Sequence, residues 1–121
     1  MITNIKFTDI EHDEALRDYA MQKVAAFTKL LQGEELTAAV CDVEFKKSTH
    51  HQHGDVCYAE VTLEVGGKVY RASKEEPTLE KAIDKVKDDI LESLRTDKGK
   101  NRDKFLKGAA TAKEWMREGE Q

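Results

Sequence analysis

The sequence lacks any long apolar run, so it offers no segment able to span a membrane. None of its 121 residues lies in a window approaching the ~18 apolar residues that a spanning helix needs. The N-terminal stretch MITNIKFTDIEH has neither the basic start nor the apolar core of a secretory signal. We therefore predict a cytoplasmic protein without a membrane partner.

Cysteine and proline are also scarce, with two cysteines and one proline. Cys41 and Cys57 each lie in an alternating apolar run, which predicts buried thiols rather than a disulfide or a nucleophile. Glycine forms no phosphate-binding loop, because Gly66-Gly67 lacks the GK[ST] ending. We therefore predict that the protein is not an enzyme, needs no cofactor and takes no small-molecule substrate.

Histidine provides the one cluster with metal-ligand chemistry. His50, His51 and His53 occur in the stretch STHHQHGD, where Asp55 could complete a zinc site. Such a loop between strands is more typical of an exposed hairpin, and protonation below about pH 6.5 would allow contact with RNA. We predict no metal site, and the role of the loop stays open.

Apolar periodicity predicts an α+β domain in the order β-α-β-β-β-α. Alternation typical of strands covers residues 2–8, 39–45, 57–65 and 68–74, and helical spacing covers 14–31 and 79–94. These elements predict a four-stranded sheet with two helices packed on one face. The domain is predicted over residues 1–95. A basic tail over 96–121, partly helical or disordered, follows with interruptions at Gly99 and Gly108.

Polar residues and glycines predict where these elements begin and end. Asp13 and Thr78 precede the two helices, and their side-chain oxygens can accept hydrogen bonds from the first turn. Gly33 is predicted to cap the C-terminus of the first helix. Gly66-Gly67 is predicted to form a two-residue hairpin turn, because glycine adopts positive φ angles at little cost.

Positive charge is concentrated late in an otherwise acidic chain. Residues 1–94 hold twelve basic and nineteen acidic residues, whereas residues 95–107 hold six basic and two acidic residues. A local basic run of this kind favours contact with phosphate. The alternative is a solvated helix end, where cations interact favourably with the helix dipole.

The uncovered face of the predicted sheet is expected to be acidic. Alternation places Asp42, Glu44, Glu60 and Glu64 on it. RNA-recognition motifs bind RNA on such a face through aromatic residues, and no such motif occurs here. Any nucleic-acid surface is therefore predicted on the helices, loops and tail.

Four short motifs and one lysine occur in an order and spacing that are typical of one protein family. They are EALR at Glu14–Arg17, Lys23, YAEVTLEV at Tyr58–Val65, RAS at Arg71–Ser73 and AID at Ala82–Asp84. With these motifs the chain resembles the ribosome hibernation promoting factors, also called ribosome-associated inhibitors or ribosomal subunit interface proteins. The resemblance implies a fold like a double-stranded-RNA-binding domain. It also implies binding to the small ribosomal subunit, in the channel for messenger and transfer RNA, which blocks translation.

The second helix departs from this family, because Asp89 and Glu92 stand where its members carry basic residues. Other cations on this helix and in the basic run after it are predicted to bind RNA in place of those two basic residues. An RNA-binding role for Arg17 and Lys23 is predicted from the resemblance alone. The tail is too short for the separate dimerisation domain of long family members. The predicted RNA-binding residues are Arg17, Lys23, Lys81, Lys85, Lys87, Arg95, Lys98, Lys100, Arg102 and Lys104.

A protein-binding regulator is the alternative function. It would dock a basic partner on the acidic sheet face and use Trp115 and Met116 of the tail. Asp89 and Glu92 favour this alternative, since they remove positive charge from the second helix. One contiguous positive face would favour RNA, and scattered lysines would favour a protein partner.

Overall fold

The computed structural model describes the backbone of residues 1–50 and 54–111, and the side chains of residues 1–48 and 56–98. Its elements are β1 (Ile2–Thr8), α1 (Glu14–Val24), the 3₁₀ helix η1 (Ala25–Leu30), α2 (Glu34–Ala38), β2 (Val40–His50), β3 (Gly54–Val65), β4 (Lys68–Glu76) and α3 (Leu79–Thr111). The chain divides into two compact units, Met1–Leu91 and Glu92–Gln121, and the first contains the whole sheet. The predicted functional boundary after residue 95 stays a prediction.

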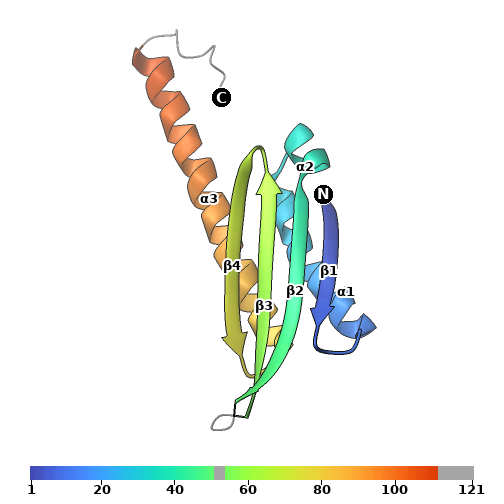
Figure 1. Ribbon diagram of the computed structural model, residues 1–121. Coiled ribbons are helices and arrows are strands. Elements are labelled where there is room, and N and C mark those ends of the chain that lie inside the picture. The colour runs from blue at the N-terminus through green and yellow to red at the C-terminus, as the bar shows by residue number, and fades with distance from the viewer. Residues whose placement is uncertain (51–53, 112–121) are drawn as a thin grey trace. The chain divides into compact units, whose positions relative to one another are not determined.

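The four strands lie in the order β1-β2-β3-β4. The first pair is parallel and the other two pairs are antiparallel. A parallel pair needs a long crossover connection, which α1, η1 and α2 supply. Helix α1 and the first turns of α3 lie on one face of the sheet, and no described helix covers the other face (Figure 1). The predicted α+β fold with its helices on one face is confirmed.

Strict alternation along β2 and β3 builds the core face of the sheet. Cys41, Val43 and Phe45 on β2 are at most 2 % exposed, and their register partners Leu63 and Val61 are fully buried. Complete burial of such side chains stabilises the fold by roughly 1.5–3 kcal/mol each. The helices contribute Leu16, Ala20, Val24, Ala82, Ile83, Val86 and Ile90 to the same core.

The predicted caps and hairpin turn are present. The backbone N–H of Leu16 donates to Asp13 Oδ1 at 3.1 Å, and that of Lys81 donates to Thr78 Oγ1 at 3.1 Å. Each such cap contributes about 1 kcal/mol to helix stability. Gly66 and Gly67 have φ angles of +56° and +80°, which the tight turn between β3 and β4 requires.

The prediction for the end of the first helix was wrong. The α-helix ends at Val24, and six residues of 3₁₀ helix follow. Three residues per turn align Val24 with Phe27, and both side chains are buried. Gly33 does not cap this helix but precedes the short helix α2, with φ +57° and ψ −127°, a conformation that suits glycine. Helix α2 itself was not predicted.

The predicted interruptions at Gly99 and Gly108 are also absent from the structure, because α3 continues through both to Thr111. A glycine inside a helix costs only about 1 kcal/mol relative to alanine. The surrounding lysine, arginine, leucine and alanine residues favour the helix and offset that cost. Among the described residues, no helix combines the length and apolar character needed to cross a membrane.

Candidate nucleic-acid interface

Asp84 links α1 to α3 on the outer surface of the helical layer. The Tyr19 hydroxyl lies 2.9 Å from both carboxylate oxygens, so its single hydrogen is shared between them. Lys23 Nζ lies 3.3 Å from Asp84 Oδ1 and 5.0 Å from the centroid of the Tyr19 ring. The two helices are therefore joined by one carboxylate that is shared between a phenol and an ammonium group.

The Asp84 carboxylate also shifts the titration of both partners. Its hydrogen bond raises the pKa of Tyr19, with smaller contributions from burial and charge, so this phenol stays protonated at neutral pH. A separate hydrogen bond from Lys23 to the same carboxylate, with the carboxylate charge, raises the pKa of Lys23. Because the Lys23 side chain is still 31 % exposed, it presents a fixed positive charge to solvent.

Sequence reasoning missed this cluster. Helical spacing puts Tyr19 beside the apolar residues of the first helix and gives no sign that its hydroxyl is directed to Asp84. Asp84 was noted only as part of the AID motif. Since the two residues are 65 positions apart, only the packing of α1 on α3 reveals their contact.

The lysines of the first part of α3 differ in their partners. Lys85 Nζ lies 3.1 Å from Glu76 Oε2 at the end of β4, and Lys87 Nζ lies 2.8 Å from Asp88 Oδ1. Lys81 is exposed, and its side chain makes no ion pair with the described residues. Lys81 lies one turn before Asp84, so it neighbours the Asp84 cluster on the helix surface.

Asp89 and Glu92 also have different surroundings. Asp89 Oδ2 lies 3.6 Å from Lys74 Nζ on β4, so the acid at this position has a cationic partner on the sheet. Glu92 is exposed. The acid at position 89 thus has an ion-pair partner, whereas nothing in the structure explains the acid at position 92.

The remaining predicted cations divide between the two units. Arg17 on α1 is half-buried, and Arg95 on α3 is exposed; neither side chain pairs with a described residue. Lys98 is half-buried. The side chains of Lys100, Arg102 and Lys104 lie outside the described part, as do Trp115 and Met116. Of these cations, Lys23 contacts Asp84, and Lys81 lies one turn before Asp84 on α3.

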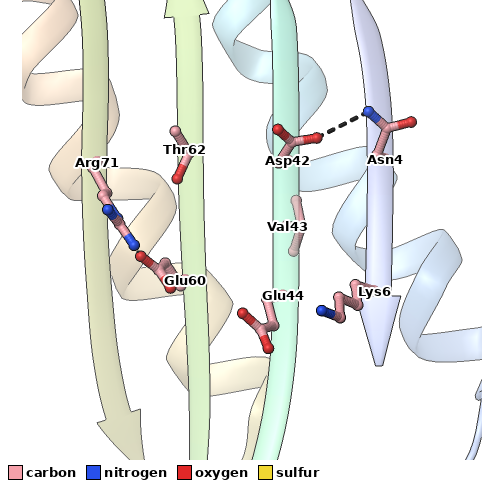
Figure 2. A pocket seen from close by; sticks show the side chains of 8 residues that line it. All are labelled: Asn4, Lys6, Asp42, Val43, Glu44, Glu60, Thr62 and Arg71. Carbon is pink, nitrogen blue, oxygen red and sulfur yellow. Dashed lines mark hydrogen bonds and ion pairs between the residues drawn. The ribbon is translucent and has the colours of Figure 1, made fainter. Parts of the chain in front are cut away.

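The uncovered sheet face carries the four predicted acids, but it also carries cations that were not predicted. Figure 2 shows Lys6 and Arg71 on this face beside Asp42, Glu44 and Glu60. Arg71 Nε forms an ion pair with Glu60 Oε2, which holds the pKa of that carboxyl below its ordinary value of 4.5. The face is thus mixed in charge, although its centre is acidic. The same alternation of side chains, applied to the sequences of β1 and β4, would have placed both cations on this face.

The cysteines of the described part of the chain are consistent with a packing role. Both cysteines are free and buried, and burial raises the pKa of Cys41 to about 12, which keeps its thiol protonated. Cys57 Sγ donates to the carbonyl oxygen of Pro77 at 3.5 Å. No three potential metal ligands gather among the described side chains, and the predicted histidine loop lies outside them.

Comparison with known proteins yields one family and two similar structures. Residues 3–102 match the family described as sigma 54 modulation protein / S30EA ribosomal protein. The crystal structure of the Thermus thermophilus Protein Y N-terminal domain has a TM-score of 0.65 at 22 % identity, covering 78 % of this chain and 96 % of that chain. A ribosomal subunit interface protein from Coxiella burnetii has a TM-score of 0.64 at 14 % identity, covering 82 % of this chain and 99 % of that chain. No curated protein matches the sequence.

The family match includes every strand of the sheet, helix α1 and the part of α3 that carries the Asp84 cluster. It also extends over most of the predicted RNA-binding cations, up to Arg102. The solved structures support the same fold at low identity. The chain therefore belongs to the sigma 54 modulation protein / S30EA ribosomal protein family.

Proposed function

We propose that this protein binds the RNA of the small ribosomal subunit and blocks translation by occupying the channel for messenger and transfer RNA. The observation that carries this proposal is the match to a ribosomal protein family over residues 3–102. The Coxiella burnetii relative of similar fold is named as a ribosomal subunit interface protein. Inhibition is steric, so it needs no cofactor and no catalytic group. Association with ribosomes places the protein in the cytoplasm.

The distribution of charge supports contact through the helices rather than through the open sheet face. The centre of that face carries Asp42, Glu44 and Glu60, which repel phosphate. Helix α1, which carries Lys23, and the first turns of α3, which carry Lys81, lie on the opposite side of the sheet (Figure 1). Phosphate contacts through such cations give affinity that depends on salt and little on sequence.

The proposed RNA-binding cations differ in whether they already form an ion pair within the protein. Arg17, Lys81 and Arg95 make no ion pair with the described residues, so they can bind phosphate directly. Lys23 would share Asp84 with the phosphate, and Lys85 would share Glu76; both lysines are partly exposed, so water and salt screen these two pairs. The full proposed set remains Arg17, Lys23, Lys81, Lys85, Lys87, Arg95, Lys98, Lys100, Arg102 and Lys104.

Sedimentation with separated ribosomal subunits tests this function. The full chain should co-sediment saturably with purified small subunits and bind large subunits much more weakly. Added to a cell-free translation reaction, it should reduce protein synthesis in proportion to small-subunit occupancy. Equal binding to both subunits, or full occupancy without inhibition, would contradict the proposal.

A further inference from the structure

Lys23 differs from the exposed Lys81 of the helical layer in how its side chain is held. Its Nζ lies 3.3 Å from Asp84 Oδ1 and 5.0 Å from the centroid of the Tyr19 ring. Lys81 makes no ion pair with the described residues. A lysine has a long, flexible stem and loses much rotamer entropy when it is fixed. Contacts on two sides therefore restrict Lys23 to a small part of the space that a free lysine samples.

These contacts hold the Lys23 ammonium group without using all of its hydrogens. An ammonium group has three N–H donors, and Asp84 and the Tyr19 oxygen can each accept from one of them. The lysine side chain is 31 % exposed. At least one N–H donor therefore remains for a ligand that approaches from solvent.

Asp84 is itself fixed by its surroundings on both helices. The Tyr19 hydroxyl lies 2.9 Å from both carboxylate oxygens. Ala82 and Ile83, just before Asp84 on α3, are fully buried, which leaves the backbone here little freedom. Tyr19 and Lys23 are one turn apart on α1, the spacing at which two side chains of a helix meet. The carboxylate therefore has a defined place relative to the lysine.

Stability alone accounts poorly for the ion pair between Lys23 and Asp84. Its two side chains are 31 % and 39 % exposed, and such pairs contribute little to stability. The hydrogen bond of Tyr19 already joins α1 to α3 without the lysine. A carboxylate beside a phosphate-binding lysine also repels phosphate. Asp84 thus lowers the affinity for RNA unless it improves the geometry of Lys23, and these two effects have opposite signs.

We propose that Asp84 is a positioning residue for RNA binding: together with Tyr19, it holds the Lys23 ammonium group so that a free N–H donor is directed to a backbone phosphate. This inference rests on the proposed function, because it describes how one of the proposed cations is prepared for the ribosome. Lys23 is ordered when the protein folds, so binding no longer bears the full cost of ordering it. Asp84 acts through Lys23 and does not itself contact RNA.

The affinity of the full chain for purified small ribosomal subunits tests this role by the sign of the effect. Asp84→Asn should weaken binding roughly three- to tenfold, the cost of ordering one long side chain. In the Lys23→Gln background, Asp84→Asn should cause no further loss, because the side chain that it positions is absent. The matched control Asp18→Asn removes the same charge from an exposed position on α1. It should leave affinity unchanged or slightly higher.

Tyr19→Phe provides a second variant that changes no charge and retains the ion pair. It should weaken binding less than Asp84→Asn but in the same direction, because the carboxylate loses its hydrogen bond to the phenol. Any loss of affinity in this variant reports on geometry rather than on repulsion. It also keeps the test decisive if Asp84→Asn fails to fold.

Nuclear magnetic relaxation of the lysine side chains in the free protein gives a readout that needs no ribosome. The terminal methylene group of Lys23 should be more ordered than those of the exposed Lys29 and Lys81. In Asp84→Asn its order should fall to their level.

Several results would overturn the inference while leaving ribosome binding in place. They are unchanged or tighter binding of Asp84→Asn, an equal loss in the Lys23→Gln background, unchanged order of Lys23, or no effect of Lys23→Gln itself. Absence of wild-type binding at low salt would overturn the proposed function. A difference in Lys23 order would then indicate a purely structural contact, and the inference would be overturned as well.

Discussion

The two faces of the sheet use the same strands for different purposes. On β2, Cys41, Val43 and Phe45 are at most 2 % exposed, while the alternate residues Asp42 and Glu44 point to the uncovered face. The core face is determined by packing, and its residues have little freedom to change. The open face keeps Glu44 opposite Glu60, an arrangement that costs stability. The flanking strands place Lys6 opposite Glu44 and Arg71 against Glu60, so the charges of this face partly offset one another.

The helical layer adds a second contrast. Its outer surface presents Lys23 and Lys81 beside Asp84, whereas the centre of the open sheet face presents carboxylates. The two sides of the sheet thus differ in charge, since the open face also carries Lys6 and Arg71 among its carboxylates. Four substitutions or sets of substitutions test this division, in order of decreasing expected effect.

Phe45→Ala should have the largest effect on stability. This ring is fully buried and stacks on Phe7 at a centroid distance of 5.7 Å. Its removal should lower the free energy of unfolding by about 3–5 kcal/mol, measured by urea denaturation. The neighbouring Glu44→Gln should change it by less than about 0.5 kcal/mol, or raise it. Similar losses at both positions would mean that the open face also serves stability.

The next largest effect is expected on ribosome binding, when the helical cations that have no described ion-pair partner are removed. The triple variant Arg17→Gln, Lys81→Gln, Arg95→Gln should bind small subunits roughly 100- to 500-fold more weakly at about 0.1 M salt, if each phosphate contact contributes roughly five- to eightfold. Urea denaturation should show little change, because these side chains make no described ion pair.

Two controls accompany this triple variant. Lys29→Gln removes an exposed lysine of η1 that is not among the proposed contacts, and it should leave affinity nearly unchanged. Glu44→Gln with Glu60→Gln should not weaken ribosome binding, because it removes negative charge from the other face. Loss of affinity in either control would show that the two surfaces are not separate.

The contrast between the two faces was predictable from the sequence, because a period of two distinguishes the sides of a strand without ambiguity. Cys41 and Cys57 were correctly placed in the core on this basis. The end of the first helix was not predictable in the same way. Val24 and Phe27 are three positions apart, a spacing that suits both an α-helix and a 3₁₀ helix.

Long-range polar contacts were beyond the reach of sequence periodicity. Tyr19 reaches Asp84, and Lys74 reaches Asp89, only because α3 packs against both α1 and the edge of the sheet. A pattern within one element records which face is apolar, but not which polar residues meet across elements. The family resemblance identified the AID motif, and the structure gives a physical role to its aspartate.

Asp84→Asn should have a moderate effect on the helical layer. It removes the charge that pairs with Lys23 and one of the two acceptors of the Tyr19 hydroxyl. We expect the free energy of unfolding to fall by about 1 kcal/mol, as for a typical hydrogen bond. The pKa of Tyr19 should fall toward its ordinary value of 10.0, because the carboxylate that raises it is gone. Ultraviolet titration of tyrosinate, with Tyr19→Phe to assign the signal, measures this shift; an unchanged pKa would contradict the contact.

Glu60→Gln should have the smallest effect, and it should depend on pH. Arg71 holds the pKa of Glu60 below 4.5 in the folded protein, with a further contribution from Tyr58. The resulting stabilisation is present above the unfolded-state pKa and is lost as pH falls through the lower, folded-state pKa. Urea midpoints of wild type and variant should therefore differ at neutral pH and converge below that value. A constant difference across this range would show that the ion pair does not form in solution.

The most direct test of ribosome binding through the helical cations is the salt dependence of small-subunit affinity. Wild-type protein should show a linear fall of log affinity with log salt. The triple variant of Arg17, Lys81 and Arg95 should reduce that slope by about 2–3, since each lost phosphate contact removes roughly 0.7–0.9. An unchanged slope, or no binding of the wild type at low salt, would contradict the proposed interface.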